Sequence, residues 1–243
     1  NVRRALIKSM DRETYGNVLL KGTYIPGGPM LPPSLDYAFD ELDKMNPDKY
    51  DVEAAKKLLA DAGWKDTDGD GFVDKDGKNL ELNFTFYSGR AELPLFAEAV
   101  QSDAKKVGIK VNLKNVDYNI LFDIGKKGEY DLLISNILTE QAGDPEFFMN
   151  VYFRTNKDGN TPENASGYSN PEYDALSEKL SGEFDPAKRR DIIIQMEKIM
   201  MNDAGTVVLG YPKTNLVSSK NIANANIYPC DYYWVTKDIT PAK

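Results

Sequence analysis

The segment YDLLISNILTEQAGDPEFFMNVYF, residues 130–153, joins an apolar run, a polar loop and a second apolar run. Residues 130–138 are rich in β-favouring side chains, which predicts a buried strand of a parallel sheet covered by helices on both faces. Polar and small residues at 139–143 predict a loop. Asp144 is placed to cap the next helix, with Pro145 at its first position. Open α/β sheets bind ligands at the carboxyl ends of their strands, so this loop is the first place to expect a site.

The sequence upstream predicts the rest of an α/β sheet. Alternating polar and apolar residues predict strands, and apolar residues at helical spacing predict helices. The predicted order is strand, helix, strand, helix and strand, at residues 80–86, 96–107, 109–113, 118–127 and 130–138. Right-handed crossovers between parallel strands would place the loops at Tyr87 and Thr139 on one edge of the sheet.

Six residues of these two loops are predicted to contact a ligand. Arg90 offers a cation for a ligand carboxylate, and Tyr87 offers stacking area and a hydroxyl. Glu140 is equally compatible with a solvated loop charge. The predicted set is Tyr87, Arg90, Leu138, Thr139, Glu140 and Gln141.

Helix signals continue on both sides of this region. Asp51 is placed to cap a helix that ends at Gly63, and the pairs Asn170-Pro171 and Asp185-Pro186 are typical of helix starts. The last of these helices has an apolar stripe, interpreted as core, of Ile192, Ile193, Met196, Ile199 and Met200. A strand is predicted at 206–211, and the proline-rich residues 26–33 predict an irregular surface crossing.

An acidic loop begins at Asp66 and resembles an EF-hand calcium loop. It places acids at positions 1, 3, 5 and 9 and glycine at position 6, but position 12 is Gly77 instead of the bidentate Glu. We therefore favour a turn-rich acidic loop over a calcium site. The weak calcium candidates are Asp66, Asp68, Asp70 and Asp74.

The charge and composition of the chain argue against several classes of function. The 243 residues carry a formal charge of −8, which argues against a nucleic-acid partner, and the apolar runs are too short to span a bilayer. The chain has no histidine and one cysteine, Cys230. An internal disulfide, a Ser-His or Cys-His catalytic pair and a histidine metal ligand are therefore excluded.

Several motifs resemble one protein family. GDPEFF at 143–148 and NASGYSNPEYDAL at 164–176 resemble the C-terminal half of the extracellular solute-binding proteins of family 5, which serve ABC importers of peptides, nickel and oligosaccharides. Four upstream segments resemble the same family in the same order: VRRALIKSMDRE (2–13), PGGPMLPP (26–33), AAKKLLADAGW (54–64) and VGIKVNLKNV (107–116).

The resemblance implies an α/β lobe like those of periplasmic binding proteins of type II, with a mostly parallel sheet flanked by helices. It divides the chain into a ligand-binding lobe at 1–205 and a return segment at 206–243, which packs on an N-terminal lobe outside this chain. The implied partners are that lobe, a small-molecule or peptide ligand and the transmembrane permease subunits of an ABC importer. The implied location is extracytoplasmic, in the periplasm or at the cell surface as a membrane-anchored lipoprotein.

The function that this resemblance implies is capture of a solute, foremost an oligopeptide, without catalysis and without a cofactor. Peptide-binding relatives place an acidic residue in the loop after the central strand. When this chain is aligned with those relatives on Asp144-Pro145, Gln141 stands at the position of their acidic residue, and Glu140 stands beside it. Nickel or metal-chelate ligands and oligosaccharides therefore stay open as alternatives to a peptide. Two alternatives are an extracellular calcium-binding or adhesion module and a hydrolase with paired carboxylates, although no pair stands out among the 38 acids.

Overall fold

A three-stranded parallel sheet lies at the centre of the computed structural model, which describes residues 1–140, 143–157, 163–228 and 235–242. The strand order is β5-β4-β6, with the strands at Glu81–Phe86 (β4), Lys110–Asn115 (β5) and Leu132–Leu133 (β6). Phe84 of β4 is in register with Leu113 on one side and Leu132 on the other. The predicted parallel α/β architecture is therefore confirmed.

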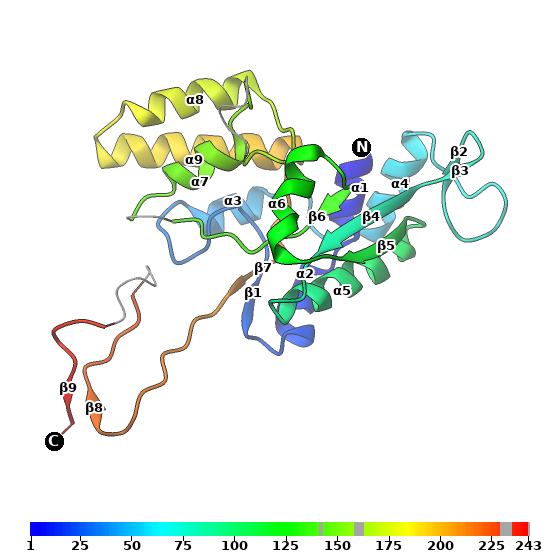
Figure 1. Ribbon diagram of the computed structural model, residues 1–243. Coiled ribbons are helices and arrows are strands. Elements are labelled where there is room, and N and C mark those ends of the chain that lie inside the picture. Colours follow the sequence, from blue (N-terminus) through cyan, green and yellow to red (C-terminus); the bar gives the residue numbers. More distant parts are fainter. Residues whose placement is uncertain (141–142, 158–162, 229–234, 243) are drawn as a thin grey trace.

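Two helical crossovers connect these strands. Glu92–Lys106 (α5) follows β4 and buries Phe96 in the core beside the sheet. Tyr118–Lys127 (α6) follows β5, and the Asp117 side chain caps it by accepting a backbone hydrogen bond of 2.8 Å. The two connections run in opposite directions across the sheet, so right-handed crossovers place α5 and α6 on opposite faces. This arrangement agrees with Figure 1.

The strand β6 is shorter than the sequence predicts. The prediction covers 130–138, whereas β6 contains only Leu132–Leu133, extended by backbone hydrogen bonds from Asp131 and Ile134 to β4. Within the described part of the chain β6 is an edge strand, and its one neighbour, β4, ends at Phe86. Beyond Ile134 the apolar run therefore has no strand to pair with, and it continues as an irregular loop.

The chain before the sheet is mostly helical. It forms Val2–Ser9 (α1), Arg12–Thr14 (α2), the π-helical segment Tyr15–Leu19 (η1), Phe39–Met45 (α3) and Val52–Asp61 (α4). The predicted cap of α4 is confirmed, because the Asp51 carboxylate accepts a hydrogen bond of 2.9 Å from the Ala54 N–H. Gly63 follows the helix with φ of 87°, as its predicted C-terminal position requires.

Three helices enclose a second hydrophobic core: Glu146–Phe153 (α7), Pro171–Ser181 (α8) and Pro186–Asp203 (α9). Asn170 and Asp185 cap α8 and α9 as predicted. Helix α7 begins one residue later than predicted, because Pro145 takes the cap position while the Asp144 carboxylate accepts a hydrogen bond of 2.8 Å from the Glu146 N–H. The predicted apolar stripe of α9 lies in this core.

The proline-rich residues 26–33 do not form the surface crossing that the sequence predicts. Met30 and Leu31 are buried in the second hydrophobic core. The prolines deprive this stretch of regular backbone pairing, but they leave the side chains between them free to enter the core. We call residues 27–33 the crossing segment.

The crossing segment follows a short antiparallel pair that joins distant parts of the chain. Tyr24–Pro26 (β1) pairs with Gly210–Pro212 (β7), with Ile25 opposite Tyr211. The strand predicted at 206–211 is therefore shorter and begins later than expected. The Tyr211 side chain is buried, so β7 belongs to the packed body of the described chain.

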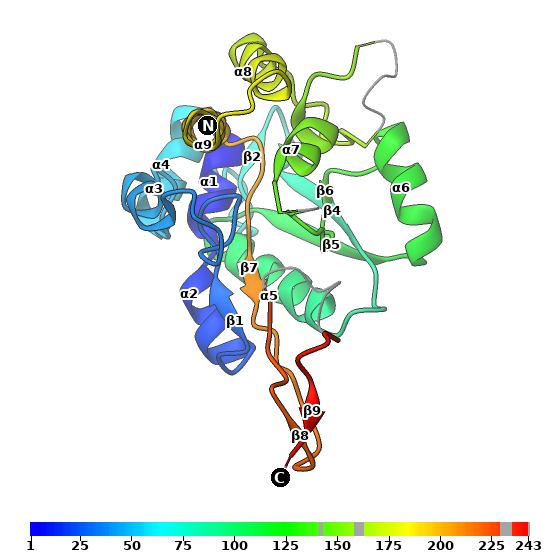
Figure 2. The ribbon, with the colours of Figure 1, turned by 90° about the vertical axis from the view of Figure 1, so that its left-hand side faces the viewer.

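The residues after β7 lead away from this body in both views (Figures 1 and 2). Here Ile222–Ala223 (β8) pairs with Thr240–Pro241 (β9) in antiparallel fashion. The Val217 side chain is almost fully exposed. Among the described residues, no helix has the length and apolar character needed to cross a membrane.

Candidate ligand-binding site

The exits of all three sheet strands lie at one edge of the sheet. Backbone hydrogen bonds join Ile134 N–H to Thr85 O at 3.1 Å and Val116 N–H to Phe86 O at 2.9 Å, so the chain leaves β6 and β5 beside the end of β4. The Asn136 side chain also reaches Glu92 at the start of α5, at 3.4 Å. The loops after β4 and β6 therefore run side by side, as the parallel topology predicts.

The predicted ligand-binding residues differ in how accessible they are. Tyr87 has only 4% of its surface exposed, so its ring forms part of the wall beneath the edge. Arg90 is exposed, and its guanidinium group forms no hydrogen bond or ion pair among the residues that the structure describes. Leu138 is 40% exposed, and Thr139 is half-buried. Arg90 and Leu138 are thus the most accessible of these four residues.

Glu140 is buried, unlike the solvated loop charge that the sequence also allowed. It has 5% of its surface exposed, and its Oε1 accepts a hydrogen bond from the Gly143 N–H. Gly143 has a φ of 87°, a conformation that glycine adopts without strain. One carboxylate oxygen of Glu140 is therefore used to shape its own loop. Gln141 lies outside the described residues.

An aromatic row at the same edge was missed in the sequence. Tyr118, at the start of α6, stacks edge to face on Tyr87 with ring centroids 5.0 Å apart, and Phe122 lies one turn further at 5.6 Å from Tyr118. Tyr118 is 48% exposed and Phe122 is 39% exposed. The missed signal is topological, because α6 follows β5 and so starts at the edge where the other two loops lie.

A pocket of about 420 Å³ adjoins the loop after β6. It is lined by Asp144, Glu146, Phe147, Asn150, Val151 and Arg189. The Arg189 guanidinium lies 2.9 Å from Asp144 and 2.8 Å from Glu146. Burial alone would lower the pKa of Arg189, but hydrogen bonds to these two carboxylates raise it. The acids of this pocket are thus already paired, and none of the five predicted ligand-binding residues that the structure describes lines it.

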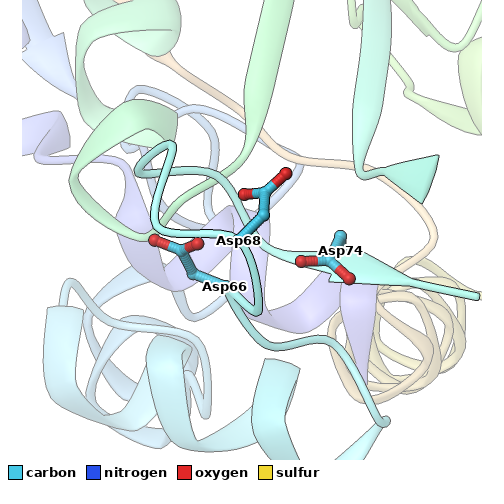
Figure 3. Close-up of side chains that lie close together, drawn as sticks. All are labelled: Asp66, Asp68 and Asp74. Atoms are coloured by element: carbon cyan, nitrogen blue, oxygen red, sulfur yellow. The ribbon is translucent and has the colours of Figure 1, made fainter. Parts of the chain in front are cut away.

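The acidic loop brings together three of the four calcium candidates (Figure 3). Carboxylate oxygens of Asp66, Asp68 and Asp74 lie within 4.8 Å of one another. Asp70 lies outside this cluster, and hydrogen bonds from the Phe72 N–H and the Asn79 side chain lower its pKa.

The acids of this loop also accept hydrogen bonds from the loop itself. Asp66 accepts from the N–H groups of Gly69 and Gly71, and Asp74 accepts from Thr67. The loop leads into the hairpin of Asp74–Lys75 (β2) and Lys78–Asn79 (β3), not into the second helix of an EF-hand. These contacts are those of a self-supporting turn.

Comparison with known proteins decides the family. The sequence profile of the bacterial extracellular solute-binding proteins, family 5 (middle region), matches residues 1–160. The chain belongs to this family. Members of family 5 are solute-binding proteins, and this membership does not favour the calcium-binding or adhesion module or the hydrolase.

Relatives of this family 5 chain bind different solutes. The oligopeptide-binding protein AppA of Bacillus subtilis is 27% identical over 247 residues, which cover 97% of this chain and 44% of AppA. The nickel-binding protein NikA of Staphylococcus aureus is 26% identical over 236 residues, which cover 97% of this chain and 44% of NikA. The chain therefore spans less than half the length of these relatives.

Solved structures agree with the fold. AppA of Bacillus subtilis in complex with a nonapeptide has a TM-score of 0.74 at 24% identity, covering 100% of this chain and 47% of AppA. An oligopeptide-binding protein of Thermotoga maritima with bound mannohexaose has a TM-score of 0.73 at 26% identity, covering 87% of this chain and 40% of that protein. Peptide, nickel and oligosaccharide binders thus all occur among the relatives of this chain.

Proposed function

We propose that this chain is the ligand-binding lobe of an ABC importer's solute-binding protein, which captures an oligopeptide between two lobes and delivers it to the permease. The observation that carries the proposal is the meeting of the β4, β5 and β6 exits at one edge, where Arg90 and the Tyr118 ring are accessible. Such an edge is where open α/β sheets receive their ligands. The relation to AppA supports a peptide as the solute.

The residues at this edge of the sheet contact different groups of the ligand. Arg90 pairs with a ligand carboxylate by a charge-assisted hydrogen bond. Tyr118 and Leu138 contact apolar ligand groups, and the buried Tyr87 supports Tyr118 from below. Glu140 meets the ligand through the oxygen that Gly143 does not use. Thr139 and Gln141 complete the loop.

The rest of the proposal concerns parts outside this chain. Residues 1–205 form the lobe, which β7 completes, and the rest of residues 206–243 returns to an N-terminal lobe that closes the cleft. Exposed apolar side chains at Val217 and Ile227 support a covering partner for the return segment. The complete protein works outside the cytoplasm, in the periplasm or as a lipoprotein at the cell surface. It binds and releases its solute unchanged.

The test uses the complete two-lobed protein and three ligand pools: peptides of graded length, nickel–histidine chelates and manno-oligosaccharides. We expect peptides alone to raise the unfolding temperature, because bound ligand stabilises the folded state. Arg90→Ala should weaken peptide binding by about 10- to 100-fold in calorimetry, the loss expected for one charge-assisted hydrogen bond.

Arg190→Ala is the matched control, because Arg190 is a partly exposed arginine on α9 that pairs with the exposed Asp36. Stabilisation by chelates or sugars alone would contradict the peptide assignment. An Arg90→Ala protein with unchanged peptide affinity would show that the site lies elsewhere.

A further inference from the structure

Glu197 has no role in the proposed ligand site, yet it is buried more completely than any other charged side chain described. It lies on α9 between Met196 and Met200 in the second hydrophobic core, with 1% of its surface exposed. Neither carboxyl oxygen has a hydrogen-bond partner within the described part of the chain. An ionised, unpartnered carboxylate is strongly disfavoured in such a place, so packing alone does not account for this residue.

The Glu197 carboxyl group faces the crossing segment. The backbone amides of Met30 and Leu31 approach it and favour its ionised form. The side chains of the same two residues are buried in the core around Glu197. The charge of the Glu197 carboxyl group therefore acts directly on the backbone of the crossing segment.

Two tyrosines interact electrostatically with Glu197. Tyr211 of β7 donates a hydrogen bond to the Pro29 carbonyl and accepts one of 3.2 Å from the Gly28 N–H, so it holds the same segment. Tyr173 of α8 donates to a carbonyl of α7 at 3.1 Å. Burial raises the pKa of both tyrosines well above the usual value of 10, so both stay neutral while Glu197 titrates.

We propose that Glu197 is a protonation-dependent latch, whose neutral carboxyl group lets the crossing segment seat on α9 and whose carboxylate releases it. Burial raises the pKa of Glu197 to about 8, although the two amides pull it down. When the segment leaves and water reaches the carboxyl group, the pKa returns toward its ordinary value of 4.5. The seated state thus binds the proton more tightly, and rising pH favours release between these two values.

The test is amide hydrogen exchange of the complete protein, followed by mass spectrometry on fragments that cover the crossing segment. The measured quantity is the protection factor, the ratio of the intrinsic to the observed exchange rate. This ratio cancels the ordinary rise of the exchange rate with pH that base catalysis causes. From about pH 5 to about pH 8 we expect it to fall about tenfold per pH unit in the wild type, as linkage requires. Glu197→Gln should remove this dependence, and Glu172→Gln, an exposed glutamate on α8, should keep it.

Three outcomes would overturn the latch. One is a protection factor in the wild type that does not change with pH. Another is an equal fall in fragments of α5, which would mean that ionisation unfolds the whole chain and does not release one segment. The third is an unchanged slope in Glu197→Gln. If that variant does not fold, the wild-type comparison between the crossing segment and α5 decides alone.

Discussion

The half-exposed ring of Tyr118 stands edge to face on the buried ring of Tyr87, with 61° between the ring planes. Tyr87 follows β4 and Tyr118 follows β5, so the contact ties the exits of two neighbouring strands together. A ring that is held from below loses little rotamer freedom when a ligand covers it. Tyr118 therefore presents a fixed, half-exposed aromatic surface at the edge of the sheet.

We expect Tyr118→Ala to weaken binding of peptides with apolar side chains by about fivefold in the complete protein, because one aromatic contact contributes about 1 kcal/mol. Calorimetry with a peptide that stabilises the wild type measures this. Phe184→Ala is the control, since Phe184 is 88% exposed and lies between α8 and α9. Equal losses in both variants would remove Tyr118 from the site.

Gly27→Ala should destabilise the chain by about 1–3 kcal/mol, the usual cost of overpacking. A Cβ atom at this position would lie 1.8 Å from the Val208 carbonyl oxygen, so the crossing segment and the chain before β7 would be forced apart. Gly89→Ala is the matched control, because its nearest contact would be 3.6 Å away. Urea denaturation of both variants measures the difference, and equal stability would refute the close approach.

Arg189→Ala should cost about 1–3 kcal/mol of unfolding free energy, because it leaves Asp144 and Glu146 without their shared partner in a partly buried place. The neighbouring Arg190→Ala should cost less than about 1 kcal/mol, since its partner Asp36 is almost fully exposed. Urea denaturation of the two variants gives the comparison. Similar losses would mean that the Arg189 pairs are as weak as surface ion pairs.

A chain that ends at residue 205 should be less stable than one that ends at 212 by at least ~2 kcal/mol, because the shorter chain lacks the buried Tyr211. Removing residues 213–243 should change the stability little, since their described side chains are mostly exposed. Thermal unfolding of the three chains tests both statements. Equal stability of the chains ending at 205 and 212 would show that β7 adds nothing to the lobe.

We expect the acidic loop to bind calcium no tighter than the millimolar range, because position 12 has no carboxylate and Asp66 and Asp74 accept hydrogen bonds from the loop. Calorimetric titration of the wild type and Asp68→Ala provides the measurement. Submillimolar affinity that is lost in Asp68→Ala would show that the three clustered carboxylates form a real cation site.

Local signals in the sequence predicted the helices well. Asp51 and the pairs Asn170-Pro171 and Asp185-Pro186 supply both a capping oxygen and a preset backbone, so these helix starts needed no tertiary information. The strand at 130–138 was overestimated because a strand also needs a neighbour, and β4 ends too early to provide one. Strand length is thus a property of the pair and not of the apolar run.

The sequence predicted where on the sheet the candidate site lies, but not all of the residues that lie there. Parallel topology placed Tyr87, Arg90 and the loop after β6 at one edge, whereas Tyr118 lies in a helix whose aromatic residues resemble ordinary core. The burial of Glu197 was not predicted for a related reason. The sequence does not show whether a single acid beside an apolar helical stripe faces water or the core. Only the packing of the crossing segment over α9 shows that it is enclosed.

The pairing of β1 with β7 also sets the order in which this chain folds during synthesis. The hydrogen bond between Tyr211 and Pro29 joins residues 182 positions apart, so β1 leaves the ribosome long before its partner exists. Closing a loop of this length costs roughly 4–5 kcal/mol in chain entropy, which the contacts of β7 repay only at the end. Until residue 212 has emerged, β1 lacks its strand partner, and an unpaired strand edge of this kind favours misassembly.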